Sequence, residues 1–327
     1  MSAGDRPFRI RPAVPADGER VAAMCAGLSA EEGLGVPSQL TAAAFRRDGF
    51  GADAAFACLM AEIEGEPVGY ALHCRDYDTD HLCRSVYLAD LYVEKAARRL
   101  GIGHALMAAT AQAALAQGAR LMMWSVLRAN EPARRFYAMM GRELPDQVET
   151  VVMHDAFIRL ADTPVPADGA TLRTAGLADS PLLGQLLQAL ITEIGDPVMP
   201  GAAAALARDG FGDDPAFTAL VAERDGRPVG YALYWPAYDT ETASRGSWLS
   251  DLYVMPDERR HGVALLLMAE LARRTRDRGG NYLVWLVHAH NEQARAFYRR
   301  IAEEWHSGIT CICDGDRFQA LAASTGL

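Results

Sequence analysis

Lysine is almost absent from this chain, because Lys95 is the only one among 32 lysine and arginine residues. A mechanism that forms a Schiff base on lysine therefore has a single candidate. Positive charge is also scarce overall, since 42 acidic residues leave a formal net charge of -10. Nucleic-acid binding needs clustered lysine and arginine, so we expect no nucleic-acid partner. The acidity is compatible with cationic ligands, and equally with a simple role in solubility.

Long apolar runs are missing as well, and the chain opens on the polar segment MSAGDRPFRIRP. We therefore expect no membrane span, no signal peptide and a cytoplasmic location. The six cysteines show no spacing typical of a disulfide framework, so buried reduced thiols explain them best. Cys311 and Cys313 are two residues apart and are expected to share one face of a strand.

An internal repeat organises the sequence. The segment RDGFGADAAFACLMAE, which starts at Arg47, returns as RDGFGDDPAFTALVAE from Arg208. The two copies align without a gap over residues 48–141 and 209–302. Such self-similarity indicates a duplicated unit. We predict an N-terminal domain at 1–160, a linker at 161–169 with two prolines and a final glycine, and a C-terminal domain at 170–327.

Each repeat has the pattern of a mixed α/β domain when strands are assigned from apolar runs and helices from the 3.6-residue period. The final strands are predicted to pair with each other and to extend toward Leu160. In the first repeat we predict strands near 8–11, 56–63, 67–74, 86–93 and 121–127, and helices from about Asp17 and Thr41 and over 101–117 and 130–140.

A glycine-containing turn follows the fourth predicted strand of each repeat. It reads RRLGIG from Arg98 and RRHGVA from Arg259, so both copies fit R-x-x-G-x-[GA]. A glycine-rich turn between a strand and a helix directs backbone N–H groups toward an anion such as a pyrophosphate. The G-x-G-x-x-G fingerprint of dinucleotide folds is not matched, because Leu106 stands where its third glycine would be.

A second motif follows the fifth predicted strand in both repeats, as NEPARRFY from Asn130 and NEQARAFY from Asn291. Asparagine is a good helix N-cap, and the aromatic pair alone would be ordinary core. The joint occurrence of the two motifs, twice and in the same order, is far more specific than either one.

On these residues each repeat resembles the GNAT superfamily of acyl-CoA N-acyltransferases, and within it the spermidine/spermine (diamine/thialysine) N-acetyltransferase family. The resemblance covers nearly the whole chain twice and implies tandem GNAT domains. Each would hold a mixed, mostly antiparallel sheet, flanked by helices and splayed between its fourth and fifth strands. Segments that carry the resemblance are IRPAVPAD from Ile10, DGFG at Asp48 and Asp209, VYLADLYV from Val86 and GYALYWPAYDT from Gly230.

The resemblance implies that acetyl-CoA is the acyl donor and that no metal takes part. A ligand amide would complete the hydrogen bonding of the splayed strand. The implied cofactor-binding residues of the first repeat are Leu91, Tyr92, Val93, Arg98, Arg99, Leu100, Gly101, Ile102, Gly103, His104, Asn130 and Ala133. Those of the second are Leu252, Tyr253, Val254, Arg259, Arg260, His261, Gly262, Val263, Ala264, Leu265 and Asn291.

The implied catalytic residues are a tyrosine and an aspartate in each repeat. An alkyl amine has a pKa of about 10.4, so it is mostly protonated at neutral pH and a base is useful. Asp90 and Asp251 match the family carboxylate, although a strand-end carboxylate satisfied by backbone N–H groups has the same pattern. Tyr137 and Tyr298 match the general acid that protonates the departing thiolate.

The amine pocket departs from the polyamine enzymes, in which a glutamate precedes that aspartate. Here Ala89 and Ser250 stand in its place. Glu31 and Glu32, expected in a loop after the first helix, would restore negative charge in the first repeat, and Asp78 matches the family as well. A solvated helix end and an Asx turn are the plain alternatives.

The expected reaction is direct acetylation of the primary amine of a small diamine-, polyamine- or amino-acid-like molecule in a ternary complex. An aminoglycoside, or a protein N-terminus or lysine, is the alternative acceptor, and a non-catalytic acetyl-CoA sensor is the alternative from another class. The repeats are expected to form an intramolecular pseudo-dimer, with a homodimer also possible. Because the first repeat keeps both glycines at Gly103 and Gly141, it is the favoured active site.

Overall fold

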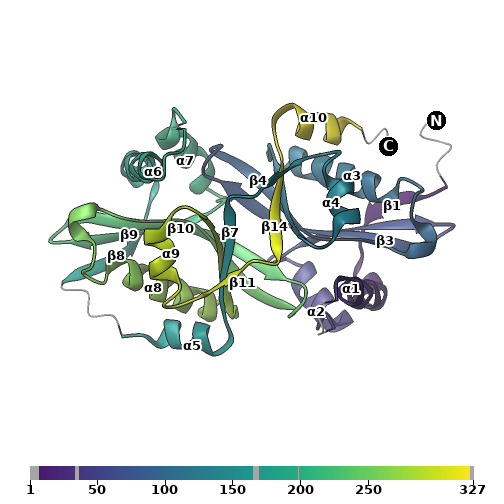
Figure 1. Cartoon of the computed structure of the whole chain (residues 1–327), viewed down its shortest axis with the longest axis horizontal. Helices are drawn as coiled ribbons and strands as arrows, with labels where there is room; N and C mark the ends of the chain where they lie inside the picture. The colour runs from purple at the N-terminus through teal and green to yellow at the C-terminus, as the bar shows by residue number, and fades with distance from the viewer. Residues whose placement is uncertain (1–6, 34–36, 165–168, 198, 325–327) are drawn as a thin grey trace.

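The protein is described by a computed structural model over residues 7–33, 37–164, 169–197 and 199–324. Two seven-stranded sheets lie next to each other, with helices on their faces (Figure 1). This confirms the predicted tandem α/β architecture. The first repeat contains β1 (Arg9–Pro12), α1 (Gly18–Glu32), α2 (Ala42–Gly49), β2 (Ala57–Ile63), β3 (Glu66–Asp78), β4 (Cys83–Val93), α3 (Ile102–Ala116), β5 (Met122–Leu127), α4 (Glu131–Tyr137), β6 (Arg142–Leu144), β7 (Gln147–Met153) and α5 (His154–Asp162).

The second repeat follows the same order, and each repeat also has short 3₁₀ turns before its first helix and after its fourth strand. Its elements are β8 (Ala170–Thr174), α6 (Ser180–Ile194), α7 (Ala202–Gly210), β9 (Thr218–Arg224), β10 (Arg227–Asp239), β11 (Ser244–Val254), α8 (Val263–Asp277), β12 (Tyr282–His288), α9 (Glu292–Tyr298), β13 (Glu303–Trp305), β14 (Gly308–Cys313) and α10 (Gly315–Ala323).

Both sheets open between their fourth and fifth strands. The strand orders are β1-β2-β3-β4-β5-β14-β6 and β13-β7-β12-β11-β10-β9-β8. Strands β4 and β5 are parallel and pair only over Val86–Leu88 of β4, although β4 continues to Val93. The pairing of β11 with β12 is shorter still, at Ser247 and Trp248 only. The second halves of β4 and β11 therefore lack a strand partner on that side.

The last strand of each repeat is exchanged. Strand β14 lies between β5 and β6 of the first sheet, and β7 lies between β12 and β13 of the second. Figure 1 shows β7 and β14 running next to each other at the junction of the two sheets. The predicted final strand pair within each repeat is therefore wrong, and residues 154–162, expected to continue a strand toward Leu160, form helix α5. The boundaries 1–160 and 170–327 remain a description of the sequence repeat.

The link from β6 to β7 lacks the turn chemistry of a tight hairpin. Only Pro145 and Asp146 separate them. Two-residue hairpin loops need a positive φ at the first central position, whereas proline fixes φ near −65°. The contrasting case is the predicted hairpin between β2 and β3, where Glu64 and Gly65 have φ values of 53° and 87°. The chain after Pro145 continues instead into the opposite sheet. The second repeat exchanges its last strand as well, although its link at His306 and Ser307 has no proline.

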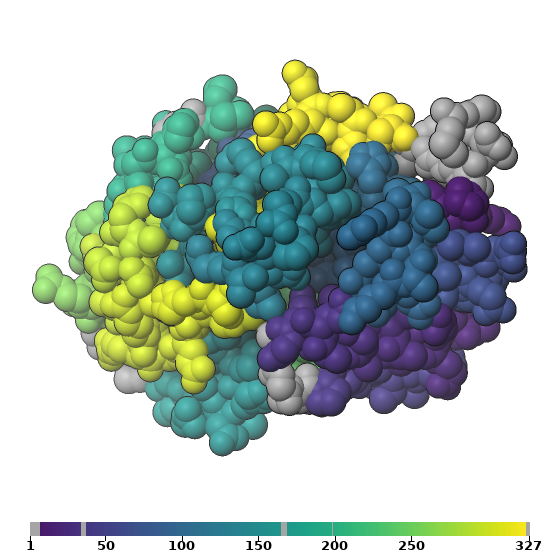
Figure 2. All heavy atoms as spheres, turned by 45° about the vertical axis from the view of Figure 1, so that its right-hand side comes forward, coloured from purple at the N-terminus to yellow at the C-terminus, as the bar shows by residue number. Residues whose placement is uncertain are grey.

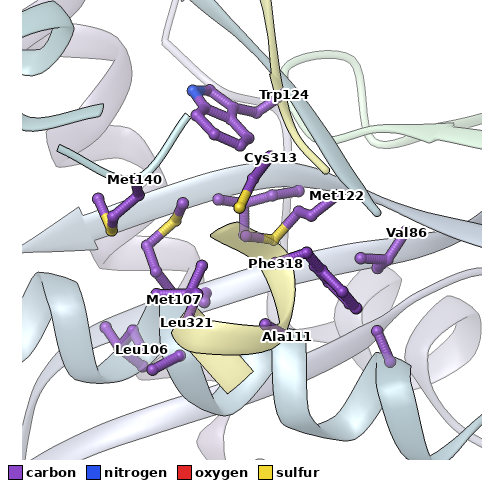
Figure 3. Packing of buried hydrophobic residues seen from close by; sticks show 14 of the residues in the cluster. Val86, Leu106, Met107, Ala111, Met122, Trp124, Met140, Cys313, Phe318 and Leu321 are labelled. Atoms are coloured by element: carbon purple, nitrogen blue, oxygen red, sulfur yellow. The ribbon is translucent and has the colours of Figure 1, made fainter. Parts of the chain in front are cut away.

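Helix α10, which follows the exchanged strand β14, packs in the hydrophobic core of the first repeat. Phe318 and Leu321 are buried in one cluster with Met107 and Trp124, and Figure 3 shows Leu321 beside Met107 and Phe318 between Met122 and Val86. In the space-filling view of Figure 2 the C-terminal segment, in yellow, lies over the first repeat. Helix α5 occupies the same position in the second core through Phe157. Each repeat thus completes its apolar core with the end of the other.

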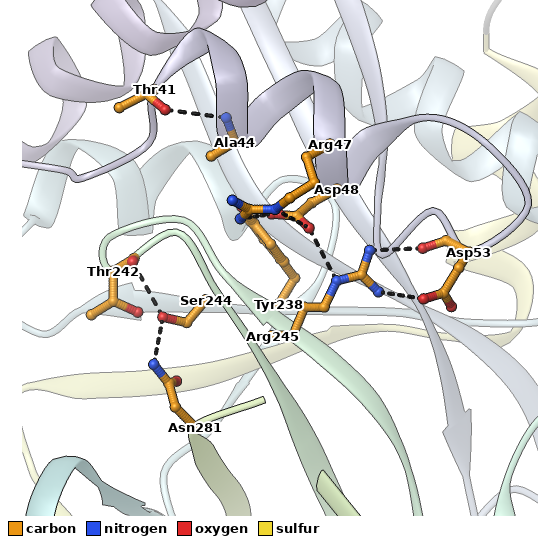
Figure 4. A network of polar contacts seen from close by, with 10 residues as sticks. All are labelled: Thr41, Ala44, Arg47, Asp48, Asp53, Tyr238, Thr242, Ser244, Arg245 and Asn281. Atoms are coloured by element: carbon orange, nitrogen blue, oxygen red, sulfur yellow. Dashed lines mark hydrogen bonds and ion pairs between the residues drawn. The ribbon is translucent and has the colours of Figure 1, made fainter. Parts of the chain in front are cut away.

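Buried polar contacts join the two repeats a second time. Asp48 of α2 accepts hydrogen bonds from the Tyr238 hydroxyl at 3.2 Å and from Nε of Arg245 at 3.0 Å (Figure 4). Arg245 continues to Asp53, whose carboxylate lies 3.1 Å away. The reciprocal contact is made by the Tyr77 hydroxyl with Asp209 at 3.4 Å. Tyr77 and Tyr238, which occupy equivalent positions in the two repeats, therefore each bind an aspartate of the other repeat.

Smaller differences concern element ends. Helix α4 ends at Tyr137, three residues before the predicted end at Met140. Of the predicted linker, Ala161 and Asp162 belong to α5, and residues 165–168 lie outside the described residues. Within the described ranges, no helix is long and apolar enough to cross a membrane.

Candidate active sites

A β-bulge marks the opening of each sheet. Strands β3 and β4 pair Leu72 with Asp90 and His73 with Leu88, so Ala89 has no partner residue. The same irregularity leaves Ser250 unpaired before Asp251. A bulge changes the direction of the strand and of the side chains beside it. Because β4 also leaves β5 after Leu88, the bulge places Asp90 at the start of the opening.

Asp90 is buried and fully hydrogen-bonded. Its Oδ2 accepts from the Tyr70 hydroxyl at 2.8 Å, and Sγ of Cys25 lies 3.6 Å away. Its Oδ1 accepts from the Thr240 hydroxyl at 2.8 Å. Burial raises the pKa of Asp90, and the hydroxyl donors partly oppose that rise. The donors to Asp90 are side chains, whereas the alternative interpretation of the sequence expected backbone N–H groups.

Asp251 has the equivalent surroundings in the second repeat. It accepts hydrogen bonds from the hydroxyls of Thr79 at 2.9 Å, Tyr231 at 3.1 Å and Ser250 at 3.2 Å. Burial raises the pKa of Asp251 to about 6 despite these donors. Each aspartate thus has one tyrosine from its own repeat and one threonine from the other.

The loop that carries Thr240 is held over the first site by Ser38 and Gln39, in the segment between α1 and α2. The Ser38 hydroxyl donates to the Thr240 carbonyl at 2.7 Å, and the Gln39 N–H donates to the Glu241 carbonyl at 2.7 Å. Asp239 accepts from the backbone N–H of Glu241 at 3.0 Å, so the Asx-turn interpretation of this motif is observed. The second repeat therefore forms one wall of the first site.

Tyr137 lies at the end of α4 and packs on Trp124 of β5, with ring centroids 5.1 Å apart. Burial and the negative charge of Glu32 raise the pKa of its hydroxyl, so Tyr137 is protonated at neutral pH. Tyr298 packs on Trp285 at 4.8 Å and also has a raised pKa, through burial and Asp251. Both phenols are therefore in the state that a proton donor requires.

The predicted cofactor turns have the expected backbone shape. Arg99 and Gly101 have φ values of 67° and 85°, and Arg260 and Gly262 repeat them at 65° and 81°. The first bond into helix α3 is donated by Ala105 to the Gly101 carbonyl, so the preceding N–H groups of its first turn have no intrahelical acceptor. A Cβ atom on Gly103 would lie 3.2 Å from the Phe136 ring. These features suit a pyrophosphate at the helix N-terminus.

Several predicted cofactor residues are already engaged within the protein. Arg98 donates to the Val93 carbonyl at 2.8 Å and to both oxygens of Glu31 at 2.8 Å. Arg259 makes the same contacts with Val254 and Glu193. These arginines stabilise the turn, and their guanidinium groups are not directed at its N–H groups.

The remaining predicted residues lie around the same opening. Asn130 and Asn291 cap α4 and α9, accepting from the N–H groups of Ala133 at 3.2 Å and Ala294 at 3.1 Å. The strand residues lie along the unpaired edge, where Tyr253 and Val254 are buried and the others are partly buried, and the turn residues lie around the helix N-terminus. The first group comprises Leu91, Tyr92, Val93, Leu252, Tyr253 and Val254, and the second comprises Leu100, Ile102, His104, His261, Val263, Ala264 and Leu265.

The predicted amine-binding residues do not converge on one site. Glu31 and Glu32 belong to α1 itself rather than to a loop after it. Glu31 is paired with Arg98, whereas Glu32 faces Asp90, and burial with that neighbour raises the pKa of Glu32 to about 7. Asp78 accepts from the N–H and Nδ1 of His81, in the loop that reaches the second site.

Sequence reasoning missed the residues contributed across the repeats. Glu241 lies near Asp90, and burial with Asp239 and Asp90 raises the pKa of Glu241 to about 7. The threonines at 79 and 240 occupy equal positions in the two repeats, as do the tyrosines at 70 and 231. That recurrence is the signal that identifies them. Among the described residues, no group of three or more His, Cys, Asp or Glu side chains is placed to hold a metal ion.

Comparison with known proteins agrees with this geometry. The acetyltransferase (GNAT) family matches twice, over 25–141 and 186–302. Thialysine N-epsilon-acetyltransferase of Sus scrofa is 36% identical over 118 residues, which is 32% of this chain and 69% of that protein. The enzyme of the same name from Mus musculus is 34% identical over 143 residues, covering 41% and 84%.

Solved structures show the same fold. A GCN5-related N-acetyltransferase from Sphaerobacter thermophilus has a TM-score of 0.53 at 21% identity, over 95% of this chain and 96% of that one. The two family matches together span most of the sequence, and each contains one bulge, one turn and one tyrosine of the sites described above. The chain is therefore a tandem member of the acetyltransferase (GNAT) family.

Proposed function

We propose that the protein transfers the acetyl group of acetyl-CoA to the primary amine of a small cationic molecule, with one site in each repeat. The observation that carries this proposal is the convergence of Asp90, Tyr137 and the glycine turn around one opening in the sheet. The repetition of that arrangement at Asp251 and Tyr298 supports a second site.

The N–H groups at the start of α3 would hold the pyrophosphate, and the unpaired edge of β4 would pair with the pantetheine amides. When bound there, acetyl-CoA supplies an activated acetyl group, which is transferred to the amine nitrogen while CoA leaves as a thiol. Tyr137 provides a protonated hydroxyl for the leaving sulfur. Asp90, held by Tyr70 and Thr240, provides a carboxylate to attract the ammonium and accept its proton.

Carboxylates in the first site favour a cationic amine. Asp90 has Glu32 and Glu241 as neighbours, and these groups raise each other's pKa. The names of the relatives refer to thialysine, and one relative from Arabidopsis thaliana is named for L-ornithine. Both names denote amino acids with a side-chain amine, which agrees with this substrate class.

Release of free thiol from acetyl-CoA across a panel of amines tests the proposal. We expect release with small alkyl amines and diamines, and slow release with aminoglycosides and lysine-containing peptides. Binding of acetyl-CoA without thiol release for any amine would contradict the proposal and support the non-catalytic sensor. Binding is measured separately by calorimetry, so the two results are distinguishable.

The acidic groups also predict how stability depends on pH. Burial and mutual repulsion raise the pKa values of Glu32, Glu149 and Glu241 to about 7 each. A carboxyl whose folded pKa lies above its unfolded value of about 4.3 stabilises the fold while protonated, and that stability is lost as pH rises through the folded pKa. The lowered pKa of His73, about 4, acts only below its unfolded value of about 6.5.

We therefore expect the Tm to fall as pH rises from about 4.5 to about 7 and to level off above pH 7, because three carboxyls with raised pKa values outweigh the one histidine. Differential scanning calorimetry measures this, and the variant Glu32→Gln with Glu241→Gln should flatten the decrease. A Tm that rises over this interval, or an unchanged slope in the double variant, would show that these carboxylates do not titrate as described.

A further inference from the structure

Glu149 is a carboxylate of the first site that comes from the opposite sheet. It lies on β7, where its register partners are Leu286 of β12 and Trp305 of β13. Yet its Oε2 accepts from the Ser125 hydroxyl of β5 in the first sheet, at 3.4 Å. Ser125 directly follows Trp124, the last residue of β5 that pairs with β4. The Glu149 carboxylate therefore lies at the opening of the first sheet.

The electrostatic neighbours of Glu149 also belong to the first site. Burial and the charges of Asp239 and Glu241 raise its pKa. Glu241 in turn interacts with Asp90, and Glu32 interacts with both. Four carboxylates from α1, β4, β7 and the loop after β10 are thus linked as electrostatic neighbours. Hydroxyl and thiol groups donate to Asp90, and a hydroxyl donates to Glu149.

The second site differs at the same positions. Thr310 of β14 takes the place of Glu149, and Ile194 that of Glu32. Asp80 takes the place of Glu241, and burial with the charges of Asp78 and Asp251 raises the pKa of Asp80 to about 7. Two further carboxylates are paired with histidines, because Asp196 lies 3.0 Å from Nε2 of His288 and Asp78 lies 2.8 Å from Nδ1 of His81. The second site therefore keeps a counterpart of Glu241 but has no carboxylate at the positions of Glu149 and Glu32.

We propose that Glu149 binds a second ammonium group of the acceptor, so that the first site selects diamines while the second accepts amines with a single positive charge. This inference rests on the proposed function. The first site lacks the glutamate that precedes the family aspartate, since Ala89 stands there. Glu149 supplies a carboxylate to the same opening from the exchanged strand. Two ammonium groups need two separated anionic partners, and Asp90 with Glu149 provides them.

The experiment compares 1,4-diaminobutane with n-butylamine, which share chain length and differ by one ammonium. Single-site enzymes are prepared with Tyr298→Phe or Tyr137→Phe. In the enzyme whose first site is intact, Glu149→Thr should raise the KM for the diamine about 10-fold or more and leave the KM for butylamine within about 2-fold. The kcat for both amines should change little, because Glu149 is proposed to bind the ammonium group that is not acetylated.

The reciprocal variant Thr310→Glu is the matched control. In the enzyme whose second site is intact, it should lower the KM for 1,4-diaminobutane and not that for butylamine. Equal effects of Glu149→Thr on both amines would overturn the proposal and show a structural role. Absence of acetylation of either amine by the unsubstituted protein would instead refute the proposed function. Calorimetric titration of 1,4-diaminobutane gives a readout that does not need turnover, and the same loss of affinity is expected there.

Discussion

Replacement of Tyr137 by phenylalanine is expected to lower kcat by about 10²- to 10⁴-fold when Tyr298→Phe has already inactivated the second site. The substitution removes one hydroxyl and keeps the ring that packs on Trp124. Because burial and Glu32 keep the phenol protonated, its loss removes a proton donor without a change in charge. Affinity for acetyl-CoA should remain within about 2-fold.

Stopped-flow measurement of thiol release gives kcat, and calorimetry gives the affinity. In the chain without other substitutions, Tyr137→Phe should reduce turnover more than Tyr298→Phe, because the first repeat keeps Gly103 and the larger set of carboxylates. Full turnover in the double variant would exclude the tyrosines as acids. Turnover lost in Tyr298→Phe but kept in Tyr137→Phe would show that the second site is the principal one.

The second large effect is structural and tests the exchange of chain ends. Phe318 is fully buried in the core of the first repeat although it lies close to the C-terminus. Substitution by alanine should destabilise the fold by about 3–5 kcal/mol, which is typical of a buried phenylalanine. Hydrogen exchange should accelerate in α3, since α10 packs directly on that helix.

Two variants serve as controls for Phe318→Ala. Phe157→Ala removes the equivalent ring of α5 and should accelerate exchange in α8 rather than α3. Ile158→Ala, beside it, removes a side chain that is 52% exposed and should change stability by less than about 0.5 kcal/mol. Faster exchange in α8 after Phe318→Ala, with α3 unaffected, would show that α10 packs on its own repeat.

Much of the fold follows from local patterns in the sequence. The apolar runs and the turn at Glu64-Gly65 predict the first five strands of each repeat, because side-chain periodicity and turn chemistry act within a few residues. The exchange of β7 and β14 has no such signal. A three-residue strand and a two-residue link are compatible with pairing in either sheet, and the choice depends on the contact between repeats.

The candidate sites likewise contain some residues that the sequence predicts and others that it does not. The turn at Gly101 and the tyrosine at 137 lie in short motifs that were identified in the sequence. Thr240 reaches Asp90 across 150 positions, and Glu149 reaches Ser125 from another sheet. Such residues are brought together by tertiary structure alone. Glu31 was expected in a loop after the first helix, whereas it belongs to α1 and pairs with Arg98.

The central claim is that this chain acetylates small amines at sites that contain Tyr137 and Tyr298. Mass spectrometry of 1,4-diaminobutane after incubation with acetyl-CoA tests it most directly, with the unsubstituted protein and the Tyr137→Phe, Tyr298→Phe double variant run in parallel. We expect a singly acetylated product from the former and a rate lower by at least about 10²-fold from the latter, with acetyl-CoA still bound by both. Equal product from both proteins, or none from the unsubstituted one, would contradict the claim.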